Sequence, residues 1–389
     1  MENFEEKASL CALNRIFGFS PKTGTALLSH IGSANEIFRL TSKSLDELLG
    51  SSSRHSGLIC REAVRKAGME LMDLEKTGVR FVGWSENGYP PLLKECADAP
   101  VGLYIKGCTP AEELWNPRHK IAIVGTRDLS PYGKEWCERT VLSFAASDDK
   151  PLIISGLALG TDICAHRMAM ESGLPTIAVM ATGPDTVYPY RHQRFAAELC
   201  RTPGCALVTD YPPGTAPLAI HFLRRNRLIA GMSDATILIE SKLKGGGMTT
   251  SRLAFSYDRD VYALPGRIDE PRSQGCNRLI REKIAEPLTS TEDILESLGL
   301  KHSRREKGLD LRERLLLHFK GKVSENIIDI MGDILKSIHK ERGITVEDVA
   351  AKTGTGYADA ARLTGLLEME GLICIDLLQR CFPETKIFR

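Results

Sequence analysis

Apolar residues change their spacing along the chain, and these changes divide it into predicted domains. From residue 1 to about 80 they recur at helical intervals, for example in Ala26–Ile31 and Leu45–Leu49, which predicts a small helical domain over residues 1–80. Over residues 119–297, short runs that are apolar throughout alternate with helical stretches. Such runs are typical of parallel strands that helices cover on both faces.

Six apolar runs are predicted to be strands of one sheet. They are Ile121–Val124, Leu152–Ile154, Thr176–Met180, Ala206–Val208, Ala235–Ile239 and Val261–Leu264. The predicted fold class is therefore α/β: an extended, Rossmann-like, doubly wound and mainly parallel sheet, with a small helical domain before it and a winged-helix domain after it.

The segments on either side of the sheet are predicted to be connections. Residues 81–118 are punctuated by proline and indicate a connector with one short strand at Val101–Lys106. Residues 298–322 indicate a charged linker, in which positions 301–322 hold eight Lys or Arg against three Asp or Glu. This excess could contact phosphate or simply be solvated.

Residues 323–389 are predicted to form a winged helix. Thr345 with Asp348 has the pattern of a capping box at the start of the first helix of a helix-turn-helix. The second helix, Tyr357–Glu370, carries three acidic residues and one arginine. A helix that enters the major groove is normally basic, so packing or protein contact is favoured here.

The N-terminal helical domain contains a tight break at Gly18–Lys22. This break is similar to that of a SAM or helix-hairpin-helix module, which often donates backbone amides to DNA phosphate. A domain that only packs remains an equal alternative.

Composition limits the functions that need be considered. The 389 residues carry a formal net charge of +1, so any nucleic-acid binding must depend on local basic clusters. Eleven scattered cysteines without a Cys-x-x-Cys pair predict reduced thiols, with no disulfide framework and no zinc site. The acidic N-terminus is unlike a signal peptide, and no run approaches the roughly 18 apolar residues of a membrane span. A cytoplasmic protein without membrane contact is expected.

Glycine and basic residues follow the carboxyl ends of four predicted strands, where ligands bind in open parallel sheets. The candidate DNA-binding residues are Gly125 and Arg127; Ser155, Gly156, Gly160 and Asp162; Phe222, Arg224, Arg225, Asn226 and Arg227; and Lys242, Lys244, Gly246, Gly247 and Thr249. Arginine offers a fork of donors to phosphate, and glycine at a helix start lets an anion approach backbone amides. Phenylalanine can stack on a base, and asparagine can bond to a base edge.

A purely structural role remains open for several of these residues. The arginines could pair with surface carboxylates, and at helical spacing Arg224 and Arg227 share a face while Arg225 points elsewhere. Asp162 is expected to cap the helix or orient an arginine. His166, which lies among alanines, is expected to be a packed histidine without a catalytic role.

The usual nucleotide-enzyme patterns are missing. The segment after the first strand lacks Gly-x-Gly-x-x-Gly, and in Gly245–Thr250 the lysines precede the glycines, unlike the Walker order. No general acid is paired with a general base. The sequence therefore predicts a binding protein with no enzymatic activity, no cofactor and no metal.

Five motifs together resemble the DprA/Smf family of bacterial DNA-processing proteins. In order they are Ile121–Arg127, Ser155–Asp162, Tyr211–Thr215, Arg225–Gly231 and Ala263–Gly266. The resemblance implies that the chain binds and protects single-stranded DNA and loads a RecA-type recombinase during natural transformation. It also implies a homodimer formed through the Rossmann-like domain.

The same resemblance implies DNA contacts at Arg127, the Ser155–Gly156 turn, Phe222–Arg227 and Lys242–Thr250. The chain departs from the family pattern in three places: Leu223 stands where proline is frequent, Met180–Pro184 replaces a loop that usually begins Leu-Gly, and Gly245–Met248 replaces a Ser-Gly-Ser stretch.

Two other functions are weighed against this one. Phosphoribohydrolases on a related fold use similar glycine-rich rims, but they carry Pro-Gly-Gly-x-Gly-Thr and a catalytic glutamate that are not found in the loop at Gly245–Thr250. A pure interaction adaptor would suit the acidic helix Tyr357–Glu370 but leaves the arginine-rich segment Arg224–Arg227 unexplained.

Overall fold

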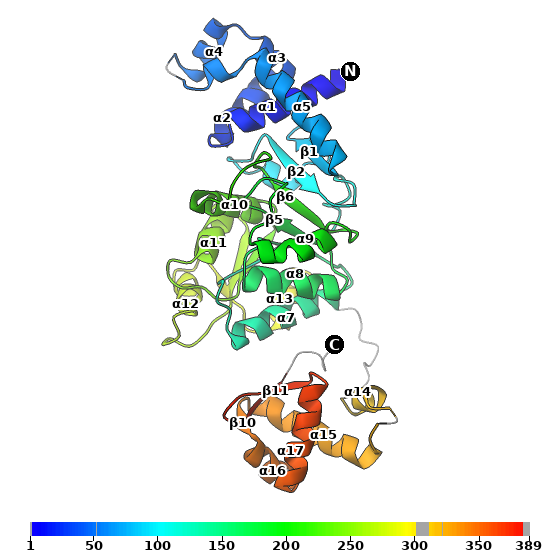
Figure 1. Cartoon of the computed structure of the whole chain (residues 1–389). Coiled ribbons are helices and arrows are strands. Elements are labelled where there is room, and N and C mark those ends of the chain that lie inside the picture. Colours follow the sequence, from blue (N-terminus) through cyan, green and yellow to red (C-terminus); the bar gives the residue numbers. More distant parts are fainter. Residues whose placement is uncertain (1, 52, 301–310, 321, 384–389) are drawn as a thin grey trace. The chain divides into compact units, whose positions relative to one another are not determined.

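The computed structural model describes residues 2–51, 53–300, 311–320 and 322–383 (Figure 1). The chain divides into two compact units, residues 1–301 and 302–389. Of the predicted charged linker, residues 301–310 and 321 lie outside the described part of the chain. Among the described helices, none is long and apolar enough to cross a membrane.

The first unit is built on one nine-stranded sheet in the order β1-β2-β6-β5-β4-β3-β7-β8-β9. Neighbouring strands from β6 to β9 are parallel, whereas β2 runs antiparallel to both β1 and β6. The strands are β1 (Val79–Gly83), β2 (Gly102–Lys106), β3 (Lys120–Val124), β4 (Leu152–Ser155), β5 (Thr176–Val179), β6 (Ala206–Thr209), β7 (Ala235–Leu238), β8 (Asp260–Ala263) and β9 (Glu286–Pro287). The predicted α/β class is confirmed, and β3 to β8 are the six predicted strands.

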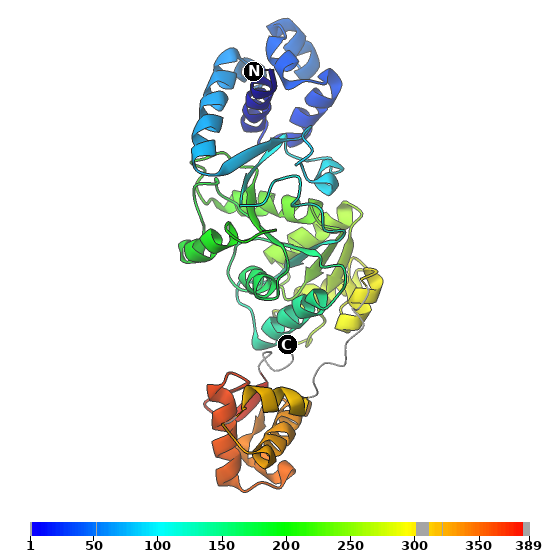
Figure 2. The ribbon, with the colours of Figure 1, turned by 90° about the vertical axis from the view of Figure 1, so that its right-hand side faces the viewer.

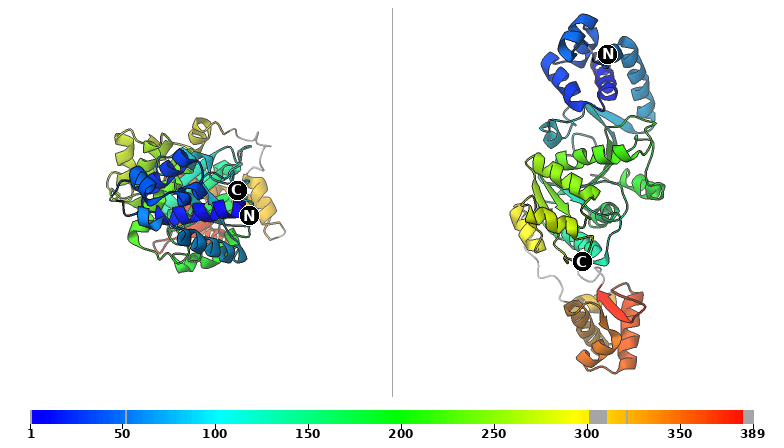
Figure 3. Two further views of the ribbon diagram at one scale, coloured as in Figure 1. Left: turned by 90° about the horizontal axis from the view of Figure 1, so that it is seen from above. Right: turned by 90° about the vertical axis from the view of Figure 1, so that its left-hand side faces the viewer.

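Helices cover both faces of this sheet (Figure 2), which is why its central strands are apolar throughout. One face packs against α7 (Pro131–Ala145), α8 (Thr161–Glu171) and α13 (Thr291–Ser297). The other packs against α6 (Pro91–Lys94), α10 (Ala219–Gly231), α11 (Gly246–Ser256) and α12 (Gln274–Arg281). On that face α10 and α11 lie side by side (Figure 3). The short η2 (Tyr190–His192) and α9 (Gln193–Leu199) follow β5.

The N-terminal helices pack on the antiparallel edge of the same sheet. They are α1 (Glu2–Ile16), α2 (Pro21–Ile31), α3 (Ala34–Arg39), α4 (Ser42–Leu49), η1 (Ser56–Leu58) and α5 (Arg61–Lys76). Phe81 of β1 and Tyr104 of β2 meet edge to face at 5.2 Å and join the core of these helices. The strand expected at Val101–Lys106 is present as β2, whereas β1 crosses the boundary that the sequence placed between residues 80 and 81.

The second unit contains α14 (Leu311–His318), α15 (Glu325–Lys340), α16 (Val346–Thr353) and α17 (Tyr357–Met369) around one core. A three-stranded antiparallel sheet joins them, formed by β10 (Ile344–Thr345), β12 (Arg380–Pro383) and β11 (Ile373–Ile375) in that spatial order. Thr345 caps α16 by accepting from the Asp348 amide, as predicted. Assignment of this unit as a winged helix stays a prediction.

The order of the strands creates a switch point beside β3. After β3 the chain moves outward through β4, β5 and β6, and it then returns to the other side of β3 with β7. The segments that follow β3 and β7 lead to helices on opposite faces of the sheet, α7 and α11. A crevice at the carboxyl ends of the strands is expected at such a point.

Candidate nucleic-acid interface

A groove of about 730 Å³ opens at this switch point. Its walls come from the loop after β3 (Val124–Asp128), the beginning of α10, and the loop after β7 (Ser241–Gly247). Tyr188, from the loop after β5, also lines it. The groove therefore brings together segments that lie more than 100 residues apart in sequence.

Nine of the sixteen residues predicted from the sequence line this groove. They are Gly125, Arg127, Asp162, Phe222, Asn226, Lys242, Lys244, Gly246 and Gly247. The other seven lie elsewhere: Ser155, Gly156, Gly160, Arg224, Arg225, Arg227 and Thr249.

Three of the lining residues are exposed cations, namely Arg127, Lys242 and Lys244. The guanidinium carbon of Arg127 lies 5.2 Å from the centre of the Phe222 ring. The ring of Tyr188 packs edge to face against the Phe222 ring, with the two ring centres 5.5 Å apart. Positive charge and an aromatic surface thus lie next to each other in the groove.

Gly245 precedes α11, and Gly246 and Gly247 are its first two residues; the first backbone amides of this helix have no partner within it and carry the positive end of its dipole. At Gly246 there is room for a ligand, because the nearest atom to a Cβ built there is Nδ2 of Asn226, 3.9 Å away. Asn226 donates to the Gly246 carbonyl at 3.3 Å and so ties α10 to α11. Such a helix start suits an anion.

Two other glycines allow close packing within the protein. Gly160 has φ +74°, and a side chain there would overlap the carbonyl oxygen of Thr126. A side chain at Gly156 would overlap the guanidinium of Arg225. Gly160 therefore lets the loop after β4 pack against the loop after β3, and Gly156 makes room for Arg225 of α10, so both positions are filled by protein atoms.

Arg225 is buried and does not line the groove, and its Nη1 donates to the Val179 carbonyl at 2.8 Å. Burial lowers the pKa of Arg225, and the neighbouring Asp162 opposes that shift. Burial likewise raises the pKa of Asp162 against the effect of Arg225. Asp162 also accepts from the Ala158 amide at 3.3 Å; its role as an orienting partner for an arginine stays a prediction, supported by its electrostatic effect on Arg225.

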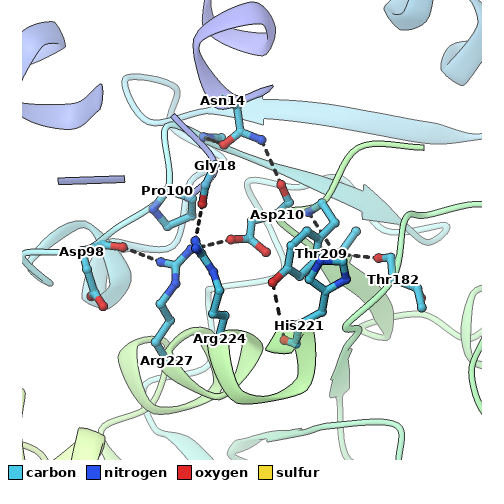
Figure 4. A network of polar contacts seen from close by, with 12 residues as sticks. Asn14, Gly18, Asp98, Pro100, Thr182, Thr209, Asp210, His221, Arg224 and Arg227 are labelled. Atoms are coloured by element: carbon cyan, nitrogen blue, oxygen red, sulfur yellow. Dashed lines mark hydrogen bonds and ion pairs between the residues drawn. The ribbon is translucent and has the colours of Figure 1, made fainter. Parts of the chain in front are cut away.

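Arg224 and Arg227 share a face of α10, as their spacing predicted, and this face meets the N-terminal part of the chain (Figure 4). Arg227 forms a buried ion pair with Asp210 and donates to the Asp98 carbonyl. Burial alone would lower the pKa of Arg227, but Asp210 together with Asp98 and two tyrosines opposes this, and the pKa rises. Arg224 donates to the Gly18 carbonyl.

Two neighbouring polar residues, His166 and Ser155, are likewise buried and bonded within the protein. The buried ring of His166 bonds to Thr176 Oγ1 at 2.7 Å and to the Gly156 carbonyl at 2.5 Å, and burial lowers its pKa to about 4. This is the packed role expected for it. The hydroxyl of Ser155 is buried and donates to the Ile123 carbonyl at 2.6 Å. Thr249 lies on α11 outside the groove lining, whereas the next residue, Thr250, lines it.

Residues 80–299 match the protein family described as DNA recombination-mediator protein A. This chain belongs to that family. The family is one of recombination mediators rather than enzymes, in agreement with the sequence prediction.

Individual relatives of the recombination-mediator family show the extent of the similarity. Protein Smf of Escherichia coli is 36% identical over 252 residues, which are 63% of this chain and 65%, just under two thirds, of that protein. The X-ray structure of DNA processing protein A from Streptococcus pneumoniae aligns with a TM-score of 0.59 at 29% identity, covering 76% of this chain and 95% of that one. A structure of the Helicobacter pylori protein, reported for its single-stranded DNA binding mode, aligns with a TM-score of 0.50 at 29% identity and covers 57% and 95% of the two chains.

The recombination-mediator match begins inside β1 and ends just after α13, so it includes every residue that lines the groove. The N-terminal helices and the second unit lie outside it.

The lining also includes residues that were not among the sixteen predicted, such as Tyr188, Pro217 and Leu223. Tyr188 could have been found, because Tyr188-Pro189-Tyr190-Arg191 sets aromatic and basic residues together after the third predicted strand. Leu223 was noted as a departure from the family pattern, within the segment Phe222–Arg227 where the resemblance implies DNA contacts.

Proposed function

We propose that this chain binds and protects single-stranded DNA in the groove and passes the strand to a RecA-type recombinase. The observation that carries the proposal is the exposed Arg127 guanidinium over the Phe222 ring, with Lys242 and Lys244 across the same groove. The single-stranded DNA binding mode reported for the Helicobacter pylori relative supports it.

In this proposal, one set of groove residues contacts the phosphates of the strand and another set contacts its bases. Arg127, Lys242 and the start of α11 offer charge-assisted and amide contacts to phosphate. Phe222 and Tyr188 offer ring surfaces, and base stacking on aromatic residues contributes about 1–3 kcal/mol per base whatever the sequence. Binding is therefore expected to depend on salt and to show little base preference.

The test is fluorescence anisotropy with labelled oligo-dT over a range of salt concentrations, using the full chain. Arg127→Ala and Lys242→Ala should each weaken binding and reduce the slope of log affinity against log salt by about 0.7, the value for one phosphate contact on a single strand. Lys150→Ala is the matched control, because this exposed lysine precedes β4 and lies at the opposite, amino end of the strand. Unchanged affinity and slope in both groove variants would refute the proposal.

Recombinase loading is a separate step and needs its own measurement. The rate at which a RecA-type recombinase assembles on single-stranded DNA should rise when this chain is added, and Arg127→Ala should abolish that rise. If the Arg127→Ala variant still speeds recombinase assembly, recombinase loading does not depend on DNA binding in the groove. The homodimer is likewise inferred from family membership, and sedimentation of the full chain as a monomer at all concentrations would contradict it.

A further inference from the structure

A band of exposed apolar side chains leaves the groove across the first turns of α10. Ile220 is 49% exposed and Leu223 is 52% exposed. Each residue of a helix turns the chain by about 100° about the helix axis, so Leu223 lies about 100° from Phe222. Ile220 and Arg224 lie about 160° from Phe222, which is nearly the opposite side of α10. Because Leu223 also lines the groove, the band begins inside it and ends on the far side of α10.

At the far end of the band is Phe19, in the break between α1 and α2. Phe19 is 57% exposed, and the guanidinium carbon of Arg224 lies 4.1 Å from the centre of its ring. Arg224 also donates to the Gly18 carbonyl, so the same side chain holds both the backbone and the ring of this loop. His221 lies 6.1 Å from the ring, tilted against it.

This arrangement has the features of a base-stacking platform. The ring is held on one side by Arg224 while more than half of the residue remains open to solvent. Lys22, three residues further on, is exposed and adds a second positive charge. A fixed aromatic surface among cations suits a nucleobase with its phosphate, whereas an apolar protein segment would gain nothing from the cations.

We propose that Phe19 stacks a nucleobase of the same single strand after that strand leaves the groove over Leu223 and Ile220. This inference rests on the proposed function, because it extends the path of the strand that the groove binds. It assigns a DNA contact to the N-terminal break Gly18–Lys22, through an aromatic ring in addition to backbone amides.

Two variants of Phe19 and two lengths of oligo-dT test the platform. A strand of about 5 nucleotides should occupy the groove alone, and one of about 16 should reach Phe19. Phe19→Ala should weaken binding of the long strand about tenfold and leave the short strand unaffected. The salt slope should not change, since stacking releases no counterions. Phe19→Trp should keep the affinity of the wild type, and the long strand should quench its added fluorescence.

Phe4→Ala is the matched control, because Phe4 lies on α1 of the same helical region and is 47% exposed. It should leave the affinity for both strands unchanged. If Phe19→Ala binds the long strand as tightly as the wild type, or loses equal affinity for both lengths, the platform is disproved while binding in the groove stands. If the wild type binds neither length, the proposed function fails and the platform with it.

Discussion

Replacing Arg227 by methionine should destabilise the first unit severely without removing a DNA contact. The Arg227–Asp210 ion pair is almost completely buried, with 7% and 6% of the two side chains exposed. Among the described hydrogen bonds, the Asp210 carboxylate accepts only that from Arg227, and its Oδ1 has no partner. Removing one partner of a buried pair typically costs about 3–5 kcal/mol. The lack of any second donor to Asp210 places the expected loss near the upper end.

Urea unfolding followed by tryptophan fluorescence measures this loss in the unit concerned, because Trp84, Trp115 and Trp136 all lie in it. Arg227→Met should lower the free energy of unfolding by about 4–5 kcal/mol. Combined with Asp210→Asn, the loss should be smaller than the sum of the two single losses by about 2 kcal/mol, because the double variant leaves no unpaired charge.

The matched control is Arg267→Met, since Arg267 pairs with Asp269 on the surface, where both side chains are at least 70% exposed. No measurable loss is expected there. The salt dependence of oligo-dT binding by folded Arg227→Met should equal that of the wild type. An unfolding loss below about 1 kcal/mol, additive losses in the double variant, or a flattened salt slope would refute the reasoning.

Two further predictions concern the loops and the core beside the groove. Gly160→Ala should lower the thermal midpoint and weaken oligo-dT binding together, because the added methyl group meets the Thr126 carbonyl at a positive φ; an unchanged midpoint would contradict this. His166 has a pKa of about 4 in the folded chain, against 6.5 ordinarily, so the unfolded chain binds the extra proton between these values. Stability should therefore fall by about 3 kcal/mol as pH drops from 6.5 to 4, and His166→Gln should reduce this fall in urea unfolding at several pH values. The lowered pKa of the nearby His192 adds to the same slope in both proteins, so equal slopes would refute the assignment to His166.

The sheet could be predicted because its strands carry their own signal. Strands such as β4 and β7 are covered on both faces, so every side chain in them is apolar or small and the run stands out against the helices around it. The residues that follow their carboxyl ends could then be examined strand by strand, and Arg127, Phe222 and Lys242, chosen in this way, line one groove in the structure. The strand β1 was missed because it follows α5 after a two-residue turn and contains Arg80.

The partners of the arginines could not be predicted. Helical spacing shows that Arg224 and Arg227 share a face, but it does not show what that face meets. Asp98 lies 129 residues before Arg227, and Gly18 lies 206 residues before Arg224. Only the folded arrangement of the N-terminal helices on the sheet brings these groups together.

The positions of these arginines change how a loss of DNA binding in any variant of the segment should be interpreted. Arg225 and Arg227 are buried on different sides of α10: Arg225 donates to the Val179 carbonyl near the charge of Asp162, and Arg227 donates to the Asp98 carbonyl and pairs with Asp210. Removing either would shift α10, and Phe222 and Asn226 would move with it out of the groove. Weak binding by such a variant is therefore expected even though its arginine touches no phosphate. The salt slope distinguishes the two causes, because only the loss of a phosphate contact reduces the number of counterions released.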